Sequence, residues 1–339
     1  MIRTSHYLFA ALCLGSLFAC SRQFTDSYIV PKWCFAVFML FIVLAYEAVN
    51  ILFYRQNEQK DTRISVYGFI IVISCFLQAM FGVVQFFGFF QISTTLWVTG
   101  SFDNPAGFAA CLCAGFPFVG FLLSDSNKYI RYVGGLIGFV IVIAVILSQS
   151  RAGIMSIAFI CFILLNMKFF HKRWVKYLSL LCFALLLSGC YWMKKDSADG
   201  RLLIWRCSVS MVKDAPWLGH GIGSFEARYM DYQADYFRQY GLNRYSMLAD
   251  NVKHPFNEYL GVLLNFGFVG LLMILALITL LIYCYKKHPC AEKRIAFYSL
   301  ISIGVFSFFS YTFTYPFTWI VTFLCIIILT KEYIAKVFT

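Results

Sequence analysis

The sequence predicts an all-α protein that crosses a membrane several times. The chain of 339 residues is 61% hydrophobic and only 13% charged, whereas a soluble domain is about half apolar and a quarter charged. The apolar residues are gathered in runs of about twenty, the length that a helix needs to cross ~30 Å of hydrocarbon. Because lipid offers backbone groups no hydrogen-bond partner, each run is expected to be a helix.

The apolar runs predict about ten membrane-spanning helices in a single integral membrane domain that covers residues 1–339. No internal repeat or low-complexity tract is visible among them. The expected spans are residues 7–20, 33–53, 64–90, 106–124, 132–149, 152–169, 177–192, 256–284, 295–313 and 317–330.

The basic residues predict the orientation of these spans. Lys and Arg gather in four short segments, 54–63, 125–131, 168–176 and 285–294. Short cytoplasmic loops carry an excess of Lys and Arg, so these segments and both termini are expected on the inner side. The net charge of +12 therefore reflects membrane topology, and we expect membrane lipid rather than nucleic acid as the partner.

The outer side is expected to hold short loops at 21–32, 91–105, 150–151 and 314–316, and one long helical segment, 193–255. The long segment is also rich in Lys and Arg, but long loops are translocated largely regardless of charge. It therefore does not contradict the predicted orientation.

Aromatic residues in this long segment recur with helical spacing. Tyr229, Tyr232, Tyr236 and Tyr240 lie three or four positions apart and would form one stripe on a helix. The stripe fits an amphipathic helix that lies on the membrane or covers the bundle. It also fits a surface on which sugar rings stack, and the two interpretations are compatible.

The N-terminal residues admit two interpretations. Leu17-Phe18-Ala19-Cys20 loosely resembles a lipoprotein cleavage site, although Phe18 fits such a site poorly. We favour retention of this segment as the first span. The topology of the remaining chain is the same in either case.

The cysteines and carboxylates do not predict a metal or redox centre. Most of the 13 cysteines lie inside apolar runs, and no C-x-x-C pair occurs, so they are expected to act as small packing residues. No D-x-D motif is present to hold a divalent ion near phosphates. We expect neither a metal nor another cofactor.

Two arginines are the first candidates for phosphate binding. Arg151 lies in the short turn between two apolar runs, which places a permanent charge at the outer boundary of the membrane; snorkelling is the simpler alternative. Arg201 follows soon after another span ends, with Arg206 close behind. A guanidinium group can bind two phosphate oxygens at once, but Arg201 and Arg206 taken alone also fit solvated loop charges.

His254 is the candidate general base. It lies where the chain re-enters the membrane, with Asn257 and Glu258 just after it. An imidazole titrates near neutral pH and can accept a proton from an attacking hydroxyl. Lys253 and nearby arginines would keep the ring neutral, and Glu258 could orient the ring or act as the base itself.

Two further segments hold weaker candidates. The glycine-rich stretch Gly219–Gly223 lacks the ending of a phosphate-binding loop, so we expect a tight turn between helices, with His220 as a second candidate base. Asp103 and Asn104 precede Pro105 in a turn pattern. A structural turn is the simpler interpretation there, and Asp103 could also contact substrate.

Five segments, taken in order, resemble the motifs of the O-antigen ligase and Wzy-type polymerase superfamily of bacterial membrane glycosyltransferases. Each is weak alone, but all five fall on the predicted outer side. They are Gly100–Pro105 ("G-x-F-x-N-P"), Ser150–Gly153 ("S-R-[GA]-G"), Arg201 with Trp205 ("R-x-x-x-W"), Leu218–Phe225 ("L-G-x-G-x-G-x-F") and His254 with Asn257–Leu260 and Phe266–Gly270 ("H-N-x-x-L … G-x-x-G").

The resemblance implies a fold, a location and a reaction. The fold would be a GT-C-like helical bundle in the bacterial inner membrane, with the active site facing the periplasm. The reaction would be inverting, metal-independent glycan transfer from undecaprenyl pyrophosphate. The donor-binding arginines would be Arg151 and Arg201, and the essential histidine would be His254. Substrate contacts are expected from residues near these three: Asp103, Asn104, Arg206, His220, Asn257 and Glu258.

The sequence departs from the family pattern in two ways and leaves the acceptor open. Pro255 and Phe256 separate the histidine from the asparagine, and the chain has about ten spans where such ligases commonly have about twelve. The acceptor is nominally lipid A-core, as in a ligase. The alternatives are a second carrier-linked glycan (polymerase) and a serine or threonine of a secreted protein. A transporter of the same lipid, or a membrane scaffold, is the alternative of another class.

Overall fold

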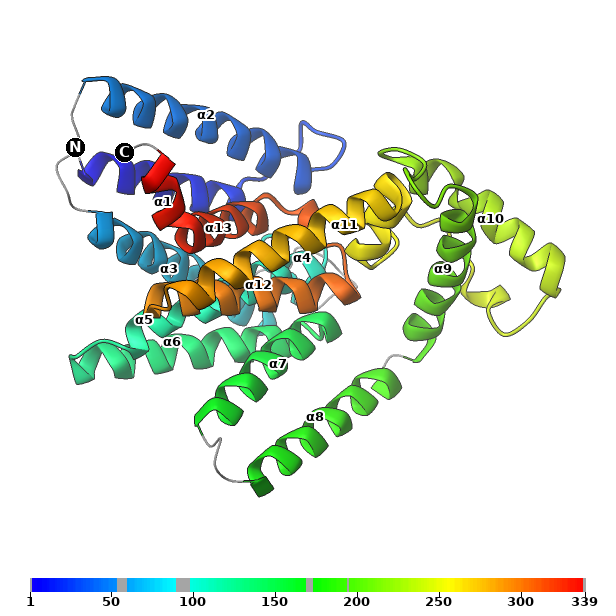
Figure 1. The fold of residues 1–339 in the computed structure, drawn as a ribbon. Helices are drawn as coiled ribbons and strands as arrows, with labels where there is room; N and C mark the ends of the chain where they lie inside the picture. Colours follow the sequence, from blue (N-terminus) through cyan, green and yellow to red (C-terminus); the bar gives the residue numbers. More distant parts are fainter. Residues whose placement is uncertain (1, 54–59, 90–97, 169–172, 194, 338–339) are drawn as a thin grey trace. The chain divides into compact units, whose positions relative to one another are not determined.

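The computed structural model describes residues 2–53, 60–89, 98–168, 173–193 and 195–337, and within these ranges the chain is helical, with no strand (Figure 1). The predicted inner residues Arg55 and Lys172 lie outside the described residues, as do residues 91–97 of the predicted outer loop 91–105. The helices are α1 (Ile2–Phe18), α2 (Ile29–Phe53), α3 (Lys60–Phe86), α4 (Pro105–Gly115), α5 (Val119–Leu123), α6 (Lys128–Leu147), α7 (Arg151–Lys168), α8 (Arg173–Met193), α9 (Lys195–Asp214), α10 (Ser224–Tyr240), α11 (Glu258–Lys287), α12 (Ala291–Phe309) and α13 (Pro316–Val337), with 3₁₀ turns η1 (Phe116–Phe118), η2 (Ser246–Leu248) and η3 (Thr312–Thr314).

The all-α membrane class is confirmed. Six helical stretches are long and apolar enough to cross a bilayer: Ile29–Val49, Ile64–Phe86, Pro105–Leu123, Lys128–Leu147, Glu258–Lys287 and Pro316–Tyr333. Thr4–Phe18 and Arg151–Met167 are apolar but shorter. Helices occupy all ten predicted ranges, while the number that cross the membrane stays a prediction.

Some predicted boundaries differ from the structure. The predicted span 106–124 is interrupted by η1, because Pro117 has no N–H to donate to the helical ladder. Helix α12 ends at Phe309 rather than at residue 313. The glycine-rich turn is confirmed between α9 and α10.

The chain forms two compact units. The first comprises residues 1–160, 284–306 and 312–339, and the second comprises residues 161–283 and 307–311. The predicted outer segment 193–255 falls wholly in the second unit. Each unit is described by itself below.

Helix α4 forms the core of the first unit. All residues from Gly107 to Gly115 are buried. Serine hydroxyls of α12 donate to carbonyl oxygens of α4, from Ser299 to Ala114 at 2.7 Å and from Ser302 to Cys113 at 2.7 Å. Small residues and hydroxyl groups let membrane helices approach closely and bond to one another, which accounts for the tight packing here.

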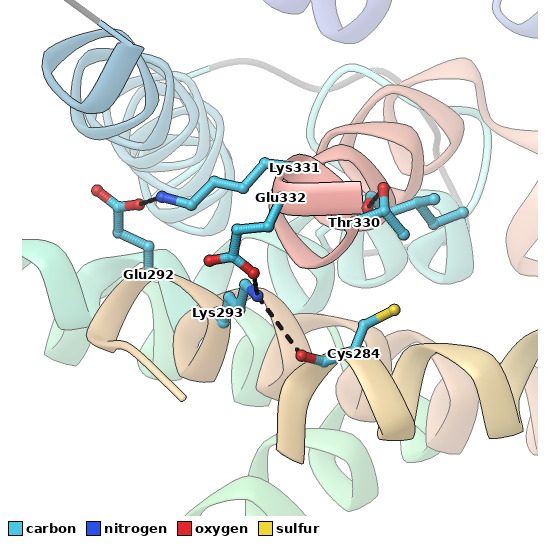
Figure 2. A network of polar contacts seen from close by, with 7 residues as sticks. Cys284, Glu292, Lys293, Thr330, Lys331 and Glu332 are labelled. Atoms are coloured by element: carbon cyan, nitrogen blue, oxygen red, sulfur yellow. Dashed lines mark hydrogen bonds and ion pairs between the residues drawn. The ribbon is translucent and has the colours of Figure 1, made fainter. Parts of the chain in front are cut away.

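Two ion pairs join the start of α12 to the last turns of α13 (Figure 2). Lys293 is fully buried, bonds to Glu332 and donates to the carbonyl oxygen of Cys284 at 3.5 Å. Lys331 pairs with Glu292 at 3.0 Å. A buried charge must be paired, because an unpaired one costs several kcal/mol. The pairs therefore lock the register of the two helices at the predicted inner end.

The second unit packs α9 and α10 around an apolar cluster. Its buried members come from α9, α10, the 241–248 loop and α11: Leu203, Ile204, Cys207, Met211, Phe225, Tyr229, Tyr245 and Leu264. Of the predicted tyrosine stripe, Tyr229 is fully buried in this cluster and Tyr240 is 61% exposed. The predicted stripe is therefore buried at Tyr229 and exposed at Tyr240, and the position of α10 on the membrane or over the bundle stays a prediction.

Helix α11 is broken at Gly267, whose φ of 62° and ψ of −160° are not helical. The glycine-rich turn pairs with the backbone groups on both sides of the break. His220 N donates to Leu264 O at 2.7 Å, and Phe268 N donates to Pro216 O at 2.8 Å. Backbone groups of a broken membrane helix need such partners, so the turn after α9 makes the break possible.

Candidate functional site

Helix α9 presents the predicted site residue Arg201 and the motif residue Trp205 one turn apart. Arg201 and Trp205 are four positions apart, so they lie on one face of the helix. The guanidinium of Arg201 donates to the carbonyl oxygen of Phe309 at 2.6 Å, and its carbon lies 4.9 Å from the centre of the Phe256 ring. Trp205 Nε1 donates to Pro255 O at 2.9 Å. This face of α9 is therefore tied to the segment that contains His254.

His254 is held by an aromatic stack. Its imidazole lies almost parallel to the ring of Tyr311, with centres 4.6 Å apart and an angle of 23°. The same tyrosine meets Phe256 edge to face at 5.3 Å. Phe256 has a φ of 52°, a conformation that is strained for a bulky residue and persists only when its surroundings hold it. The positions of both rings around Tyr311 are thus imposed by packing.

The structure therefore brings Arg201 and His254 to one aromatic pair, Phe256 and Tyr311. Arg201 lies over Phe256, and His254 lies on Tyr311. All four residues belong to the second unit. A permanent cation with a planar fork and a titratable ring thus share one apolar wall, an arrangement that can hold an anion next to a proton acceptor.

Burial lowers the pKa of His254 below its usual value. Glu226 acts in the opposite direction and raises the pKa, while Lys253 lowers it further. The neutral imidazole is therefore favoured at pH 7, as the sequence predicts. The main cause is loss of solvent rather than the positive neighbours.

The two residues after this stack begin the next helix. Asn257 is buried, and its side-chain oxygen accepts from Leu260 N at 3.0 Å. It therefore caps the first turn of α11. Glu258 is the first residue of the helix, where its negative charge interacts favourably with the positive end of the helix dipole. The predicted substrate contacts of both residues stay predictions.

Arg206 and His220 lie away from the stack. Arg206 is exposed, donates to the hydroxyl of Tyr236 at 3.3 Å and lies 5.2 Å from the centre of the Tyr245 ring. Both ring nitrogens of His220 have neighbours, Met211 O at 2.7 Å and Arg228 at 3.1 Å. The structure therefore gives His220 a role in holding the glycine-rich turn.

The remaining predicted site residues belong to the first unit. Arg151 is the first residue of α7 and follows the short predicted turn. Asn104 caps α4 by accepting from Gly107 N at 2.9 Å, and its side-chain oxygen also accepts from the hydroxyl of Tyr315 at 3.2 Å. Burial raises the pKa of Asp103. The expected turn at 103–105 is confirmed.

Among the described residues, no group of three or more His, Cys, Asp or Glu side chains is placed to hold a metal ion. The cations of the site are arginines. Any phosphate held there would be neutralised by guanidinium groups.

Tyr311 is not among the site residues that the sequence predicts. It lies beyond the end of α12, within the range 295–313 predicted as a continuous span. The polar run Ser310-Tyr311-Thr312 marks the end of the apolar stretch. A tyrosine at a membrane boundary was the only available signal, and it does not identify the ring on which Tyr311 stacks.

Part of the chain matches a known protein family. Residues 136–275 match the family model described as O-Antigen ligase. This match supports the resemblance of the chain to the O-antigen ligase and Wzy-type superfamily. The matched range includes Arg151, Arg201 and His254, while Tyr311 lies beyond it. The superfamily indicates glycan transfer, by ligation or polymerisation, in a multi-pass membrane protein. A comparison with curated proteins finds no match.

Proposed function

We propose that this protein transfers a glycan from undecaprenyl pyrophosphate to an acceptor hydroxyl at the outer face of the bacterial inner membrane, as its match to the O-antigen ligase family model suggests. The observation that supports this most directly is the shared contact of Arg201 and His254 with the Phe256–Tyr311 pair. One residue suits the phosphate of the donor, and the other suits the proton of the acceptor.

His254 acts as the general base in this proposal. Its neutral imidazole takes the proton of the acceptor hydroxyl as that oxygen attacks the anomeric carbon. The new glycosidic bond forms on the face opposite the pyrophosphate, so the configuration inverts. The bond between the anomeric carbon and the pyrophosphate oxygen breaks, and undecaprenyl pyrophosphate leaves with the electron pair.

Arg201 and Arg151 bind the pyrophosphate in this proposal. Charge builds on the leaving oxygens as the bond breaks, and a guanidinium that binds two of them stabilises the transition state more than the ground state. Arg201 already uses one donor on Phe309 O. The rest of its fork is directed by that bond, which limits the entropy lost on binding.

Tyr311 positions the imidazole in this proposal. The parallel stack keeps the ring in one orientation. The face of an aromatic ring also attracts a cation, so the stack favours the imidazolium that forms when His254 takes the proton.

The acceptor is nominally the lipid A-core, which makes the protein a ligase. A second carrier-linked glycan would make it a polymerase, and a protein hydroxyl would make it an O-oligosaccharyltransferase. A transporter would bind the same donor without transfer.

A transfer assay tests the proposal. Purified protein in nanodiscs receives an undecaprenyl-pyrophosphate-linked glycan, each of the three acceptors in turn, and EDTA. We expect one acceptor to be glycosylated and undecaprenyl pyrophosphate to be released, with both signals lost in His254→Ala. Donor binding without transfer to any acceptor would instead favour a transporter. Transfer that EDTA abolishes would contradict the metal-independent mechanism.

A further inference from the structure

A second cluster of cations and aromatic rings lies on another face of α9. Arg206 is five positions after Arg201, which places it about 140° further around the helix. There it meets Tyr236 of α10 and Tyr245. The arginine–tyrosine patch, as we call it, consists of Arg206, Tyr236, Tyr240, Arg244 and Tyr245.

Two guanidinium groups share one ring in this patch. The guanidinium carbons of Arg206 and Arg244 lie 5.2 Å and 4.7 Å from the centre of the Tyr245 ring. Hydrogen bonds to tyrosine hydroxyls hold both groups, at 3.3 Å from Arg206 to Tyr236 and at 2.6 Å from Arg244 to Tyr245. Two exposed cations are thus fixed in place rather than spread through solvent.

The positive charge of the patch is not cancelled by ion pairing. In the described ranges, neither Arg206 nor Arg244 has a carboxylate oxygen within 4.0 Å. Asp199 acts electrostatically on Arg244, but it is buried and accepts a hydrogen bond from Tyr191 at 3.2 Å. The two arginines repel each other, and a bound anion would relieve that repulsion.

The aromatic part of the patch offers a flat contact beside these charges. The rings of Tyr236 and Tyr240 have centres 4.9 Å apart. Tyr240 is 61% exposed, whereas Tyr245 below the arginines is buried. An exposed apolar ring next to fixed guanidinium groups suits a ligand that has both a ring and a negative charge.

We propose that the arginine–tyrosine patch is a binding subsite for a negatively charged sugar residue, one bearing a carboxylate or a phosphate. This inference rests on the proposed function, because the glycan substrates are what would bring such sugars to this segment. The anionic group binds Arg206 and Arg244, and the sugar ring stacks on Tyr240.

The phosphate of a lipid headgroup has the same charge and is the competing ligand. Leu242 and Met247, which flank Arg244, are strongly exposed and would suit contact with lipid. The hydrogen bonds that fix both guanidinium groups favour the sugar, because attraction to a charged membrane surface needs no fixed geometry.

A binding measurement tests the subsite without turnover. Full-length protein in phosphatidylcholine nanodiscs is titrated with trigalacturonic acid and with its methyl ester, in which neutral ester groups replace the carboxylates. We expect the acid to bind about tenfold tighter than the ester, as charge-assisted bonds to two arginines allow. The double variant Arg206→Gln/Arg244→Gln should lose this preference.

Matched controls keep the result interpretable. Arg238→Gln removes the same charge from α10, where Arg238 pairs with Asp235 at 2.8 Å, and should keep the preference. His254→Ala should abolish transfer and leave acid binding intact, so failure of the proposed function and failure of the subsite are distinguishable. Equal affinity for acid and ester, or a preference that survives the double substitution, would overturn the proposal. If added phosphatidylglycerol displaces the acid, and the displacement depends on Arg206 and Arg244, the patch would be assigned to lipid instead.

Discussion

At the scale of single residues, the site depends on what each side chain can do that a similar one cannot. Arg201 illustrates this, because its guanidinium donates to Phe309 O and still carries further donors. An ammonium group could keep the single backbone bond and the positive charge. It could not bind two phosphate oxygens in parallel.

Arg201→Lys should therefore lower kcat/KM about a hundredfold or more while the fold persists, since losing one transition-state donor costs roughly that much. The transfer assay measures the loss. Arg238→Lys on α10 is the control and should be neutral. Full turnover in Arg201→Lys would remove bidentate phosphate binding as its role.

In the proposed mechanism, the pH profile of transfer follows the protonation of His254. Its pKa is lowered by burial, so activity should be lost only as the pH falls through that lowered value. Glu226 raises the pKa and Lys253 lowers it. Glu226→Gln should thus move the acid limb of kcat/KM to lower pH, and Lys253→Gln should move it to higher pH. Shifts in the same direction, or no shift, would show that another group controls the limb.

Two substitutions of Tyr311 distinguish the contribution of its stacked ring from that of its hydroxyl group. Tyr311→Phe keeps an aromatic face against His254 and should retain most of the activity. Tyr311→Leu removes the stack that favours the imidazolium, so kcat should fall about tenfold and the acid limb should move to lower pH. If the midpoint of the acid limb is unchanged in Tyr311→Leu, the tyrosine contributes packing alone and does not favour the imidazolium.

At the scale of elements, the break in α11 and the glycine-rich turn are joined by backbone hydrogen bonds and form one structural unit. A Cβ at Gly267 would lie 2.3 Å from the backbone of Trp217. Its backbone angles also fall in a region that is essentially restricted to glycine. The turn and the break therefore depend on each other, and both support the segment that starts at His254.

Gly267→Ala should consequently destabilise the protein by about 3 kcal/mol or more. The check is the midpoint of thermal denaturation, followed by circular dichroism in detergent. Gly261→Ala in the same helix is the control, because its Cβ meets only Pro255 at 3.6 Å. An unchanged midpoint in Gly267→Ala would mean that the turn and helix separate without cost.

At the scale of the whole molecule, the proposed function requires the polar segment of the second unit to face outward. Met247 is 93% exposed in that segment, and residues 285–294 are predicted to face inward. A membrane-impermeant maleimide applied to intact spheroplasts should therefore label Met247→Cys above the wild-type background. His288→Cys should gain label only after permeabilisation. The reverse pattern would invert the predicted topology.

The class of protein and the order of its helices follow from local residue patterns in the chain. Runs of apolar residues specify membrane helices because lipid leaves the backbone no other hydrogen-bond partner. The glycine-rich turn and the start of α11 at the Asn257 cap also follow from local residue types. These features depend on neighbours close in sequence, so they are readable from the chain.

The contacts between side chains of distant segments could not be read from the chain. Arg201 and Phe309 are 108 positions apart, and no periodicity relates His254 to Tyr311. The pairing of the glycine-rich turn with the break at Gly267 and the meeting of Arg206 and Arg244 on Tyr245 are equally invisible in the chain. Such contacts result from the packing of distant segments, in which close-packed side chains select one arrangement among many with the same apolar pattern.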